Sequence, residues 1–202
     1  MSRYKDNHFD LAIVDPPYGI DADKKNSAKK LQSKKSAGLS KDYGNQKWDS
    51  DIPNDEYFAE LKRVSKRQVV WGANFFNLQG GMLFWHKHVT MPTYSQGELA
   101  WLSWLNKVDF VSIAWHGMIQ HDMKNKEIRI HPTQKPVKLY EWLLMNYAKE
   151  GDKILDTHLG SGSIALACHN LGYDLTACEL DKEYYNAAME RIERHKQQLT
   201  MF

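Results

Sequence analysis

Residues 153–179 read KILDTHLGSGSIALACHNLGYDLTACE. A strand-sized apolar run at 153–156 precedes the turn Gly160-Ser161-Gly162, a helical pattern over 164–171 and a second apolar run over 174–179. Short apolar runs bounded by glycine are typical of buried strands, whereas a 3.6-residue period indicates a helix. Strand, helix and strand in this order predict a parallel βαβ unit, and therefore an α/β fold with both faces of the sheet covered.

The same alternation continues on both sides of this segment. Downstream, Asp181 predicts the cap of an amphipathic helix with Tyr185, Met189 and Ile192 on its apolar face. Upstream, Pro136 predicts the first turn of a helix that Gly151 closes. The C-terminal third therefore predicts a regular series of strands and helices.

The N-terminal part contains further strand-like runs. Phe9–Val14 predicts a buried strand stopped by two prolines, and Asn54 predicts a helix cap. Shorter apolar runs follow at 68–71 and 82–85. The runs 99–104 and 110–115, joined by a short polar turn, predict an antiparallel pair. We expect one domain over residues 1–202, with an inserted loop at about 21–50.

Composition excludes several classes of protein. The chain has 202 residues, of which 42% are hydrophobic and 26% charged, as in ordinary globular proteins. The apolar runs are too short to span a membrane, and no signal peptide is recognisable at the N-terminus. The two cysteines, Cys168 and Cys178, fit a reducing compartment better than a secreted framework. We expect a cytoplasmic protein.

Positive charge is concentrated in the inserted loop. Residues 23–47 hold eight lysines and two aspartates, in a chain whose formal net charge is +2. Such asymmetry favours contact with a polyanion, although a solvated lysine loop explains the charge equally well.

The glycine turn favours a nucleotide-like ligand. Glycines let the backbone approach a ligand closely, and the following helix offers free amide groups. Glu179 ends the next strand 17 residues after Gly162, where a carboxylate can bind a ribose diol. Gly160-x-Gly162-x-x-Ala165 also satisfies the dinucleotide pattern, and a plain tight turn is the simplest alternative.

A second motif, Asp15-Pro16-Pro17-Tyr18, follows the first strand. Ligands of open parallel sheets bind at this end of the strands. A carboxylate and rigid carbonyl groups beside an aromatic ring suit a flat heterocycle with an exocyclic amine. A rigid Pro-Pro turn without function is the alternative.

Three motifs together resemble those of the amino-methylating DNA methyltransferases. Asp15–Tyr18 resembles their catalytic signature, and 156–162 resembles their S-adenosylmethionine loop. His131–Pro136, which reads HPTQKP, is similar to the motif at the methionine end of the cofactor. The order is that of the circularly permuted beta class. The resemblance implies a Rossmann-like methyltransferase sheet, mostly parallel with an antiparallel strand pair.

The resemblance also implies a function. Methyl transfer from S-adenosylmethionine to N6 of adenine at specific sites in double-stranded DNA would require the target base to be flipped out. Asp15 and the Pro16 carbonyl would accept hydrogen bonds from the amine, with Pro17 completing the motif and Tyr18 stacking on the base. The implied cofactor residues are Thr133, Gln134, Lys135, Asp156, His158, Leu159, Gly160, Ser161, Gly162 and Glu179. The lysines expected to contact phosphates are Lys24, Lys25, Lys29, Lys30, Lys34 and Lys35.

Alternatives remain open from the sequence alone. They are methylation of cytosine N4, methylation of RNA adenine, and a non-catalytic nucleic-acid-binding relative. His158 stands where the family often has Phe, which favours the last of these. No histidine spacing indicates a metal site, so no metal is expected. Pairing as a homodimer, common in the family, is a further expectation.

Overall fold

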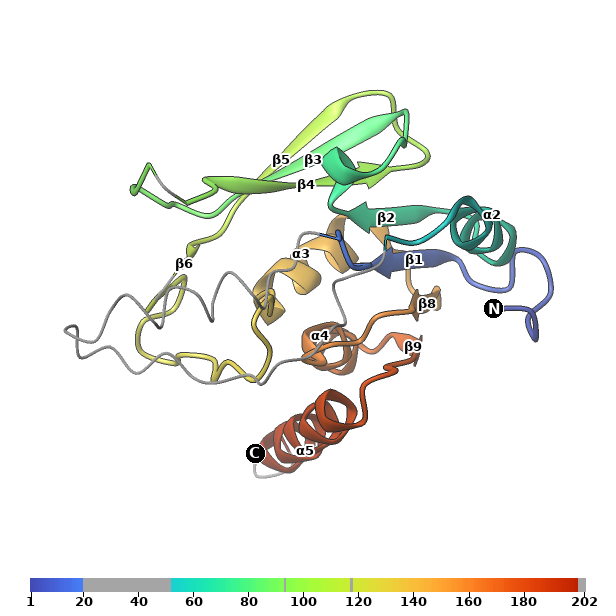
Figure 1. Cartoon of the computed structure of the whole chain (residues 1–202). Helices are drawn as coiled ribbons and strands as arrows, with labels where there is room; N and C mark the ends of the chain where they lie inside the picture. The colour runs from blue at the N-terminus through green and yellow to red at the C-terminus, as the bar shows by residue number, and fades with distance from the viewer. Residues whose placement is uncertain (20–51, 93, 117, 200–202) are drawn as a thin grey trace.

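The computed structural model describes residues 1–19, 52–92, 94–116 and 118–199 (Figure 1). The inserted loop predicted at about 21–50 lies outside the described residues. The same holds for the lysines predicted to contact phosphates: Lys24, Lys25, Lys29, Lys30, Lys34 and Lys35.

A seven-stranded sheet with the order β5-β3-β4-β2-β1-β8-β9 forms the centre of the molecule. Strand β1 (Leu11–Val14) pairs in parallel with β2 (Gln68–Trp71) on one side and with β8 (Lys153–Asp156) on the other. Strand β9 (Asp174–Ala177) is parallel to β8, so the predicted βαβ unit is confirmed. All four residues of β1 are buried, as expected for a strand covered on both faces.

The antiparallel part of the sheet differs from the prediction. Strand β4 (Gly97–Leu102) lies antiparallel between β2 and β3 (Gly81–His86), while β5 (Val108–Ser112) is parallel to β3. The predicted pairing of 99–104 with 110–115 is therefore wrong.

The reason is the path of the chain after β4. The chain crosses the end of β3, where the Gly81 N–H donates to the Leu105 carbonyl at 2.6 Å and the Met82 N–H to that of Lys107 at 3.0 Å. These bonds direct β5 to the far side of β3, so the two consecutive strands are not neighbours.

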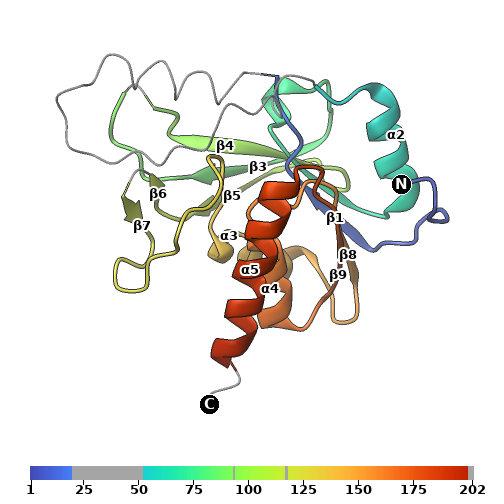
Figure 2. The ribbon, with the colours of Figure 1, turned by 60° about the horizontal axis from the view of Figure 1, so that its bottom comes forward.

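Helices cover both faces of the sheet (Figures 1 and 2). Successive strand residues point to opposite faces, so alternate residues of β1 and β2 enter two different cores. One core packs against α2 (Asp55–Val64). The other packs against α3 (Val137–Tyr147), α4 (Ser163–Leu171) and α5 (Lys182–Leu199).

Side-chain caps begin two of these helices as predicted. Asn54 accepts a hydrogen bond from the Tyr57 N–H at 3.0 Å, and Asp181 accepts two from the start of α5. The core-facing residues of α5 include Tyr184, whereas the predicted Tyr185 is 45% exposed. Helix α3 ends at Tyr147, before the turn that contains Gly151, so this glycine does not end the helix.

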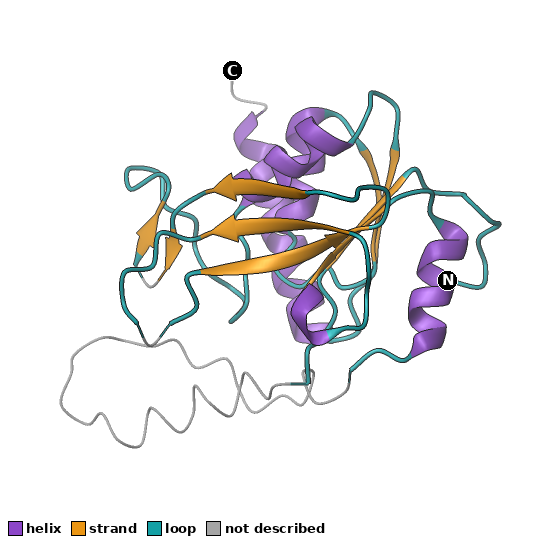
Figure 3. Cartoon of the chain, turned by 90° about the horizontal axis from the view of Figure 1, so that it is seen from above, coloured by secondary structure: helices purple, strands orange, loops and turns teal. Residues whose placement is uncertain are grey.

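Short elements complete the architecture. A 3-10 helix, η1 (Ala73–Phe75), follows β2, and a small hairpin consists of β6 (Trp115–His116) and β7 (Ile119–Gln120). Figure 3, viewed from above, shows this hairpin beyond one end of the main sheet. No helix in the described ranges is long and apolar enough to cross a membrane.

Candidate functional site

A cavity of about 470 Å³ lies at the carboxyl ends of β1, β8 and β9. Parallel strands end at one edge of the sheet, so the pairing of β1 with β8 brings Asp15 beside the glycine turn. The predicted site residues that line the cavity are Asp15, Pro17, Thr133, Gln134, Lys135, His158, Leu159, Gly160, Ser161 and Glu179. Motifs that lie more than 100 residues apart in sequence thus share one cavity.

The cavity also has lining residues that the sequence did not single out. They are Tyr140, Thr157, Leu180 and Tyr184; His131, from the motif at 131–136, and Asp181, predicted as a helix cap, also line the cavity. Leu180 and Tyr184 follow Glu179 closely, which is a signal that could have indicated them. Tyr140 comes from the middle of α3, and no local pattern points to it.

The glycine turn is tied directly to Glu179. The Gly160 N–H donates to one carboxylate oxygen of Glu179 at 2.8 Å, and the Asp181 N–H donates to the other at 2.9 Å. Gly162 has φ +73°, and a Cβ there would lie 3.3 Å from the Cβ of Ala188. The turn therefore requires glycine at position 162. The two hydrogen bonds fix the Glu179 carboxylate, which keeps further lone pairs that can accept hydrogen bonds from a ligand.

His158 is a neutral ring in the wall of the cavity. Its Nδ1 lies 2.9 Å from the Thr157 hydroxyl, which also lies 2.7 Å from the hydroxyl of Tyr57. Burial lowers the pKa of His158 to about 4. At neutral pH the imidazole therefore forms a flat, uncharged part of the cavity lining.

Also in the lining of the cavity, His131 packs against Tyr184 with ring centroids 4.2 Å apart. Its Nδ1 lies 3.1 Å from the Thr133 hydroxyl. Burial, together with the charge of Lys135, lowers the pKa of His131 to about 4. This part of the lining is therefore aromatic and uncharged near neutral pH.

Asp156 lies behind the glycine turn and is 2% exposed. One carboxylate oxygen accepts a hydrogen bond from the His158 N–H at 2.9 Å. Burial, and then the charges of Asp15 and Glu179, raise the pKa of Asp156 to about 7. Its charge state therefore changes close to neutral pH.

The Asp15 carboxylate has a partner on each oxygen. The Tyr18 hydroxyl donates to one oxygen, and the Lys135 ammonium group donates to the other. The Tyr18 ring stacks on Phe75 at a centroid distance of 4.9 Å and an angle of 13°. Burial and the charge of Asp15 raise the pKa of Tyr18, so the phenol keeps its proton. A carboxylate and a stacked aromatic ring thus stand together at the end of β1.

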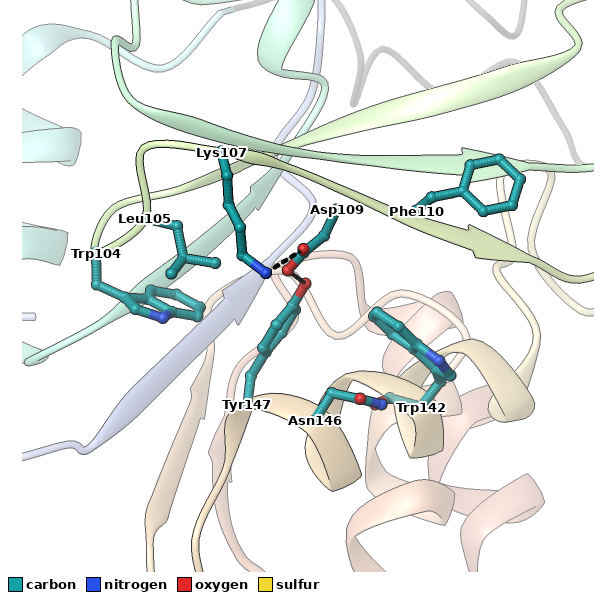
Figure 4. Close-up of a pocket in the computed structure, with 8 residues that line it drawn as sticks. All are labelled: Trp104, Leu105, Lys107, Asp109, Phe110, Trp142, Asn146 and Tyr147. Carbon is teal, nitrogen blue, oxygen red and sulfur yellow. Dashed lines mark hydrogen bonds and ion pairs between the residues drawn. The ribbon is translucent and has the colours of Figure 1, made fainter.

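A second cavity, of about 360 Å³, is separate from this site (Figure 4). It lies between α3 and the chain that leads into β5, and it shares no lining residue with the first cavity. Its polar groups are satisfied locally, because Asp109 accepts from Tyr147 at 2.8 Å and pairs with Lys107 at 2.7 Å. Within the described ranges, no three His, Cys, Asp or Glu residues form a group suited to a metal ion.

A profile described as DNA methylase, covering the N6 and N4 types, matches residues 39–190. Because this is most of the chain, the protein belongs to the N6/N4 DNA methylase family. The resemblance seen in the sequence is confirmed at the level of this family. Assignment to the permuted beta class stays a prediction.

Curated relatives match over a shorter segment. The Type II methyltransferase M.HpaI of Haemophilus parainfluenzae is 39% identical over 69 residues, covering 34% of this chain and 22% of the relative. Type II methyltransferase M2.DpnII of Streptococcus pneumoniae is 41% identical over 63 residues, covering 31% and 24%. The match thus spans less than a quarter of either relative.

Solved structures share the fold over nearly the whole chain. The M1.HpyAVI–SAM complex has a TM-score of 0.56 at 22% identity, covering 94% of this chain and 90% of that one. TTHA0409 from Thermus thermophilus, complexed with S-adenosyl-L-methionine, has a TM-score of 0.55 at 18% identity, covering 96% and 89%. The Rossmann-like, mostly parallel sheet expected from the sequence is confirmed.

Proposed function

We propose that this chain transfers a methyl group from S-adenosylmethionine to the exocyclic N6 of adenine in double-stranded DNA. One observation carries the proposal: the Asp15 carboxylate lines the same cavity as the Gly160 turn and Glu179. A carboxylate that can accept hydrogen bonds from the target amine therefore adjoins a site suited to a nucleoside. Membership of the DNA methylase family and the methyltransferase names of the relatives support the same interpretation.

The cavity fits a nucleoside cofactor in size and in chemistry. Its volume of about 470 Å³ falls within the usual range for small-molecule sites. Glu179 would bind the ribose diol, Leu180 and His158 would contact flat or apolar parts, and Thr133 and Gln134 would hold the polar end. When bound, the cofactor supplies a methyl group activated by its sulfonium.

The task left to the protein is to prepare the amine. The lone pair of an aromatic amine is delocalised into the ring, which makes the nitrogen a poor nucleophile. Acceptors on its two hydrogens favour a more tetrahedral nitrogen and stabilise the positive charge that develops in the transition state. Asp15 and the Pro16 carbonyl would be these acceptors, and Pro17 would restrict the backbone.

The target base has to leave the duplex, at a cost of a few kcal/mol. Stacking on Tyr18, whose ring already packs against Phe75, would offset part of this cost. The lysines of the inserted segment would contribute phosphate contacts. Recognition of a specific site would then come from contacts to base edges.

Nucleoside mass spectrometry after transfer of labelled methyl groups tests this proposal. N6-methyladenine from DNA is the expected product, whereas N4-methylcytosine would favour the related cytosine reaction. Methylation of RNA in preference to DNA would overturn the choice of nucleic acid. Absence of both product and calorimetric cofactor binding would favour a non-catalytic relative.

Two further properties belong to the proposal. Pairing as a homodimer is expected, and light scattering tests it. A cytoplasmic location agrees with two free thiols, Cys168 and Cys178.

A further inference from the structure

The catalytic carboxylate is the first member of a chain of alternating charges that runs into the sheet. Asp15 pairs with Lys135, and the Lys135 ammonium lies 3.1 Å from a carboxylate oxygen of Glu98. The other oxygen of Glu98 pairs with Lys87. Charges of opposite sign thus alternate from the cavity wall to β3 and β4.

The lysine at the centre of this ion-pair chain is shielded from water. The Lys135 side chain is 3% exposed, and its ammonium group lies 5.1 Å from the centre of the Trp71 ring. Burial opposes ionisation of Lys135, but the charges of Asp15 and Glu98 raise its pKa. Burial likewise opposes ionisation of Glu98, yet Lys135 and Lys87 lower its pKa to about 2. Lys135 and Glu98 therefore both stay charged at neutral pH, and each depends on its neighbours in the chain.

The backbone on both sides of Lys135 is fixed. The Gln134 carbonyl accepts from the Trp115 indole at 2.7 Å, and the Gln134 side chain accepts from the Ile130 N–H at 2.9 Å. Pro136 begins α3 immediately afterwards. With its backbone fixed and its side chain buried between two carboxylates, Lys135 has little freedom to move its ammonium group.

We propose that Lys135 is a positioning residue for Asp15, and that Glu98 and Lys87 hold it in place. This rests on the proposed methyl transfer and goes beyond the cofactor contact expected from the sequence. A carboxylate has about four lone-pair sites, of which Lys135 and Tyr18 use two. The remaining sites stay directed at the cavity because the Lys135 contact stops rotation of the carboxylate. Misplacement of a reacting group by about 1 Å can cost about 100-fold in rate.

Lys135→Met and Glu98→Gln provide the test, with kcat and the cofactor Kd measured separately. Glu98 is not among the described residues that line the cofactor cavity, and its direct contact with Lys135 is the route by which we expect its replacement to affect the reaction. We expect kcat to fall about 100-fold in Lys135→Met and about tenfold in Glu98→Gln, with the cofactor Kd of Glu98→Gln within about twofold of wild type. Lys135→Arg should recover part of kcat, because it restores the positive charge.

The double variant Lys135→Met/Glu98→Gln tests whether the lost activity comes from unfolding of the single variants. It removes both charges of one pair, and it should be no slower than Lys135→Met alone if the two residues act in series. Additive losses, an unchanged kcat in Glu98→Gln, or a raised cofactor Kd in Lys135→Met at unchanged kcat would each overturn the positioning role. Failure of wild-type protein to methylate DNA would instead contradict the proposed function.

Discussion

At the scale of single residues, two carboxylates of this site are in very different environments. Glu98 is held ionised by two lysines, whereas among the described residues Asp156 pairs with no lysine and accepts one backbone hydrogen bond. Burial therefore dominates at Asp156 and raises its pKa to about 7. The same kind of side chain can be a permanent charge or a titrating group, depending on its partners.

Asp156→Asn is predicted to change how stability depends on pH. The unfolded chain loses this proton near pH 4, whereas the folded protein keeps it until about pH 7. The contribution of Asp156 to the free energy of unfolding therefore falls as pH rises across this window. Asparagine stays neutral and keeps the acceptor for His158, so the variant should be more stable at pH 8 by a few kcal/mol and similar at pH 4.

Urea unfolding at pH 4 and pH 8 measures this difference. His131 and His158 have lowered pKa values, so both proteins lose stability as pH falls from about 6.5 to 4. Because wild type and variant share this loss, it cancels in the comparison. Parallel pH profiles for the two proteins would refute the assignment to Asp156.

Some of the site could be predicted from local sequence, and some could not. Asp15, the glycine turn and Glu179 stand at strand ends, so their convergence follows from strand order. The contact of Lys135 with Glu98 joins residues far apart in sequence, and it depends on β4 lying beside β2. No local pattern encodes that arrangement.

At the scale of elements, the connection from β2 to η1 sets the position of the Tyr18 ring. Gly72 has φ +76°, and a Cβ there would lie 2.2 Å from Cε1 of Tyr18. The ring therefore packs on bare backbone. Any side chain at this position has to displace Tyr18 from its stack with Phe75.

Gly72→Ala is predicted to lower kcat about tenfold or more, since a displaced Tyr18 misplaces the base. Gly151→Ala is the matched control, because this glycine has φ +80° but a Cβ added there would meet no atom within 4 Å. Both variants incur about 1–2 kcal/mol of backbone strain. Thermal unfolding and steady-state kinetics separate the two effects, and equal kcat values would contradict the account.

Helix α5 holds the glycine turn through one buried side chain. Arg191 donates at 2.9 Å to both the Ser161 carbonyl and the Ser163 hydroxyl, and it pairs with Glu127 at 2.7 Å. Glu127 in turn accepts from the Val137 N–H at 2.9 Å. The turn, α3 and α5 are therefore linked by a single guanidinium group.

Arg191→Met is predicted to weaken cofactor binding about tenfold, equivalent to about 1.4 kcal/mol, because the turn loses its anchor. Arg194→Met, on the exposed side of the same helix, is the control. Isothermal titration with S-adenosylmethionine compares the two. The same Kd in both variants would show that Arg191 does not position the turn.

Strand pairing marks the limit of prediction at this scale. Helix caps at Asn54 and Asp181 were predictable because capping depends on neighbouring residues. The neighbours of β5 could not be predicted, because adjacency in sequence favours a hairpin with β4. Instead, the hydrogen bonds of Leu105 and Lys107 to the start of β3 direct β5 to the side of β3, and such tertiary contacts have no local signature.

At the scale of the whole molecule, one strand pair assembles the site from both ends of the chain. Leu11 and Ala12 of β1 pair with Ile154 and Leu155 of β8. This pairing sets Asp15 against the glycine turn at one edge of the sheet. The Asp15 motif and the glycine turn, which are separate in the sequence, thus border a single cavity.

The inserted lysines give a prediction at this scale. Replacing six of them with glutamine should weaken DNA binding. It should also reduce the slope of the logarithm of the DNA-binding constant against the logarithm of the salt concentration by up to about 5 in magnitude. Cofactor binding should not change. The replaced residues are Lys24, Lys25, Lys29, Lys30, Lys34 and Lys35. Fluorescence anisotropy over a salt series measures the slope, and an unchanged slope would remove these lysines from the DNA interface.

The most direct measurement is transfer of labelled methyl groups to duplex DNA by wild-type protein and by Asp15→Ala, with identification of the methylated nucleoside. We predict N6-methyladenine from the wild type and a loss of about 100-fold or more in the variant, with cofactor binding retained. Full activity in Asp15→Ala would contradict the central role of this carboxylate. A wild-type protein that binds the cofactor but yields no methylated adenine would contradict the proposed reaction.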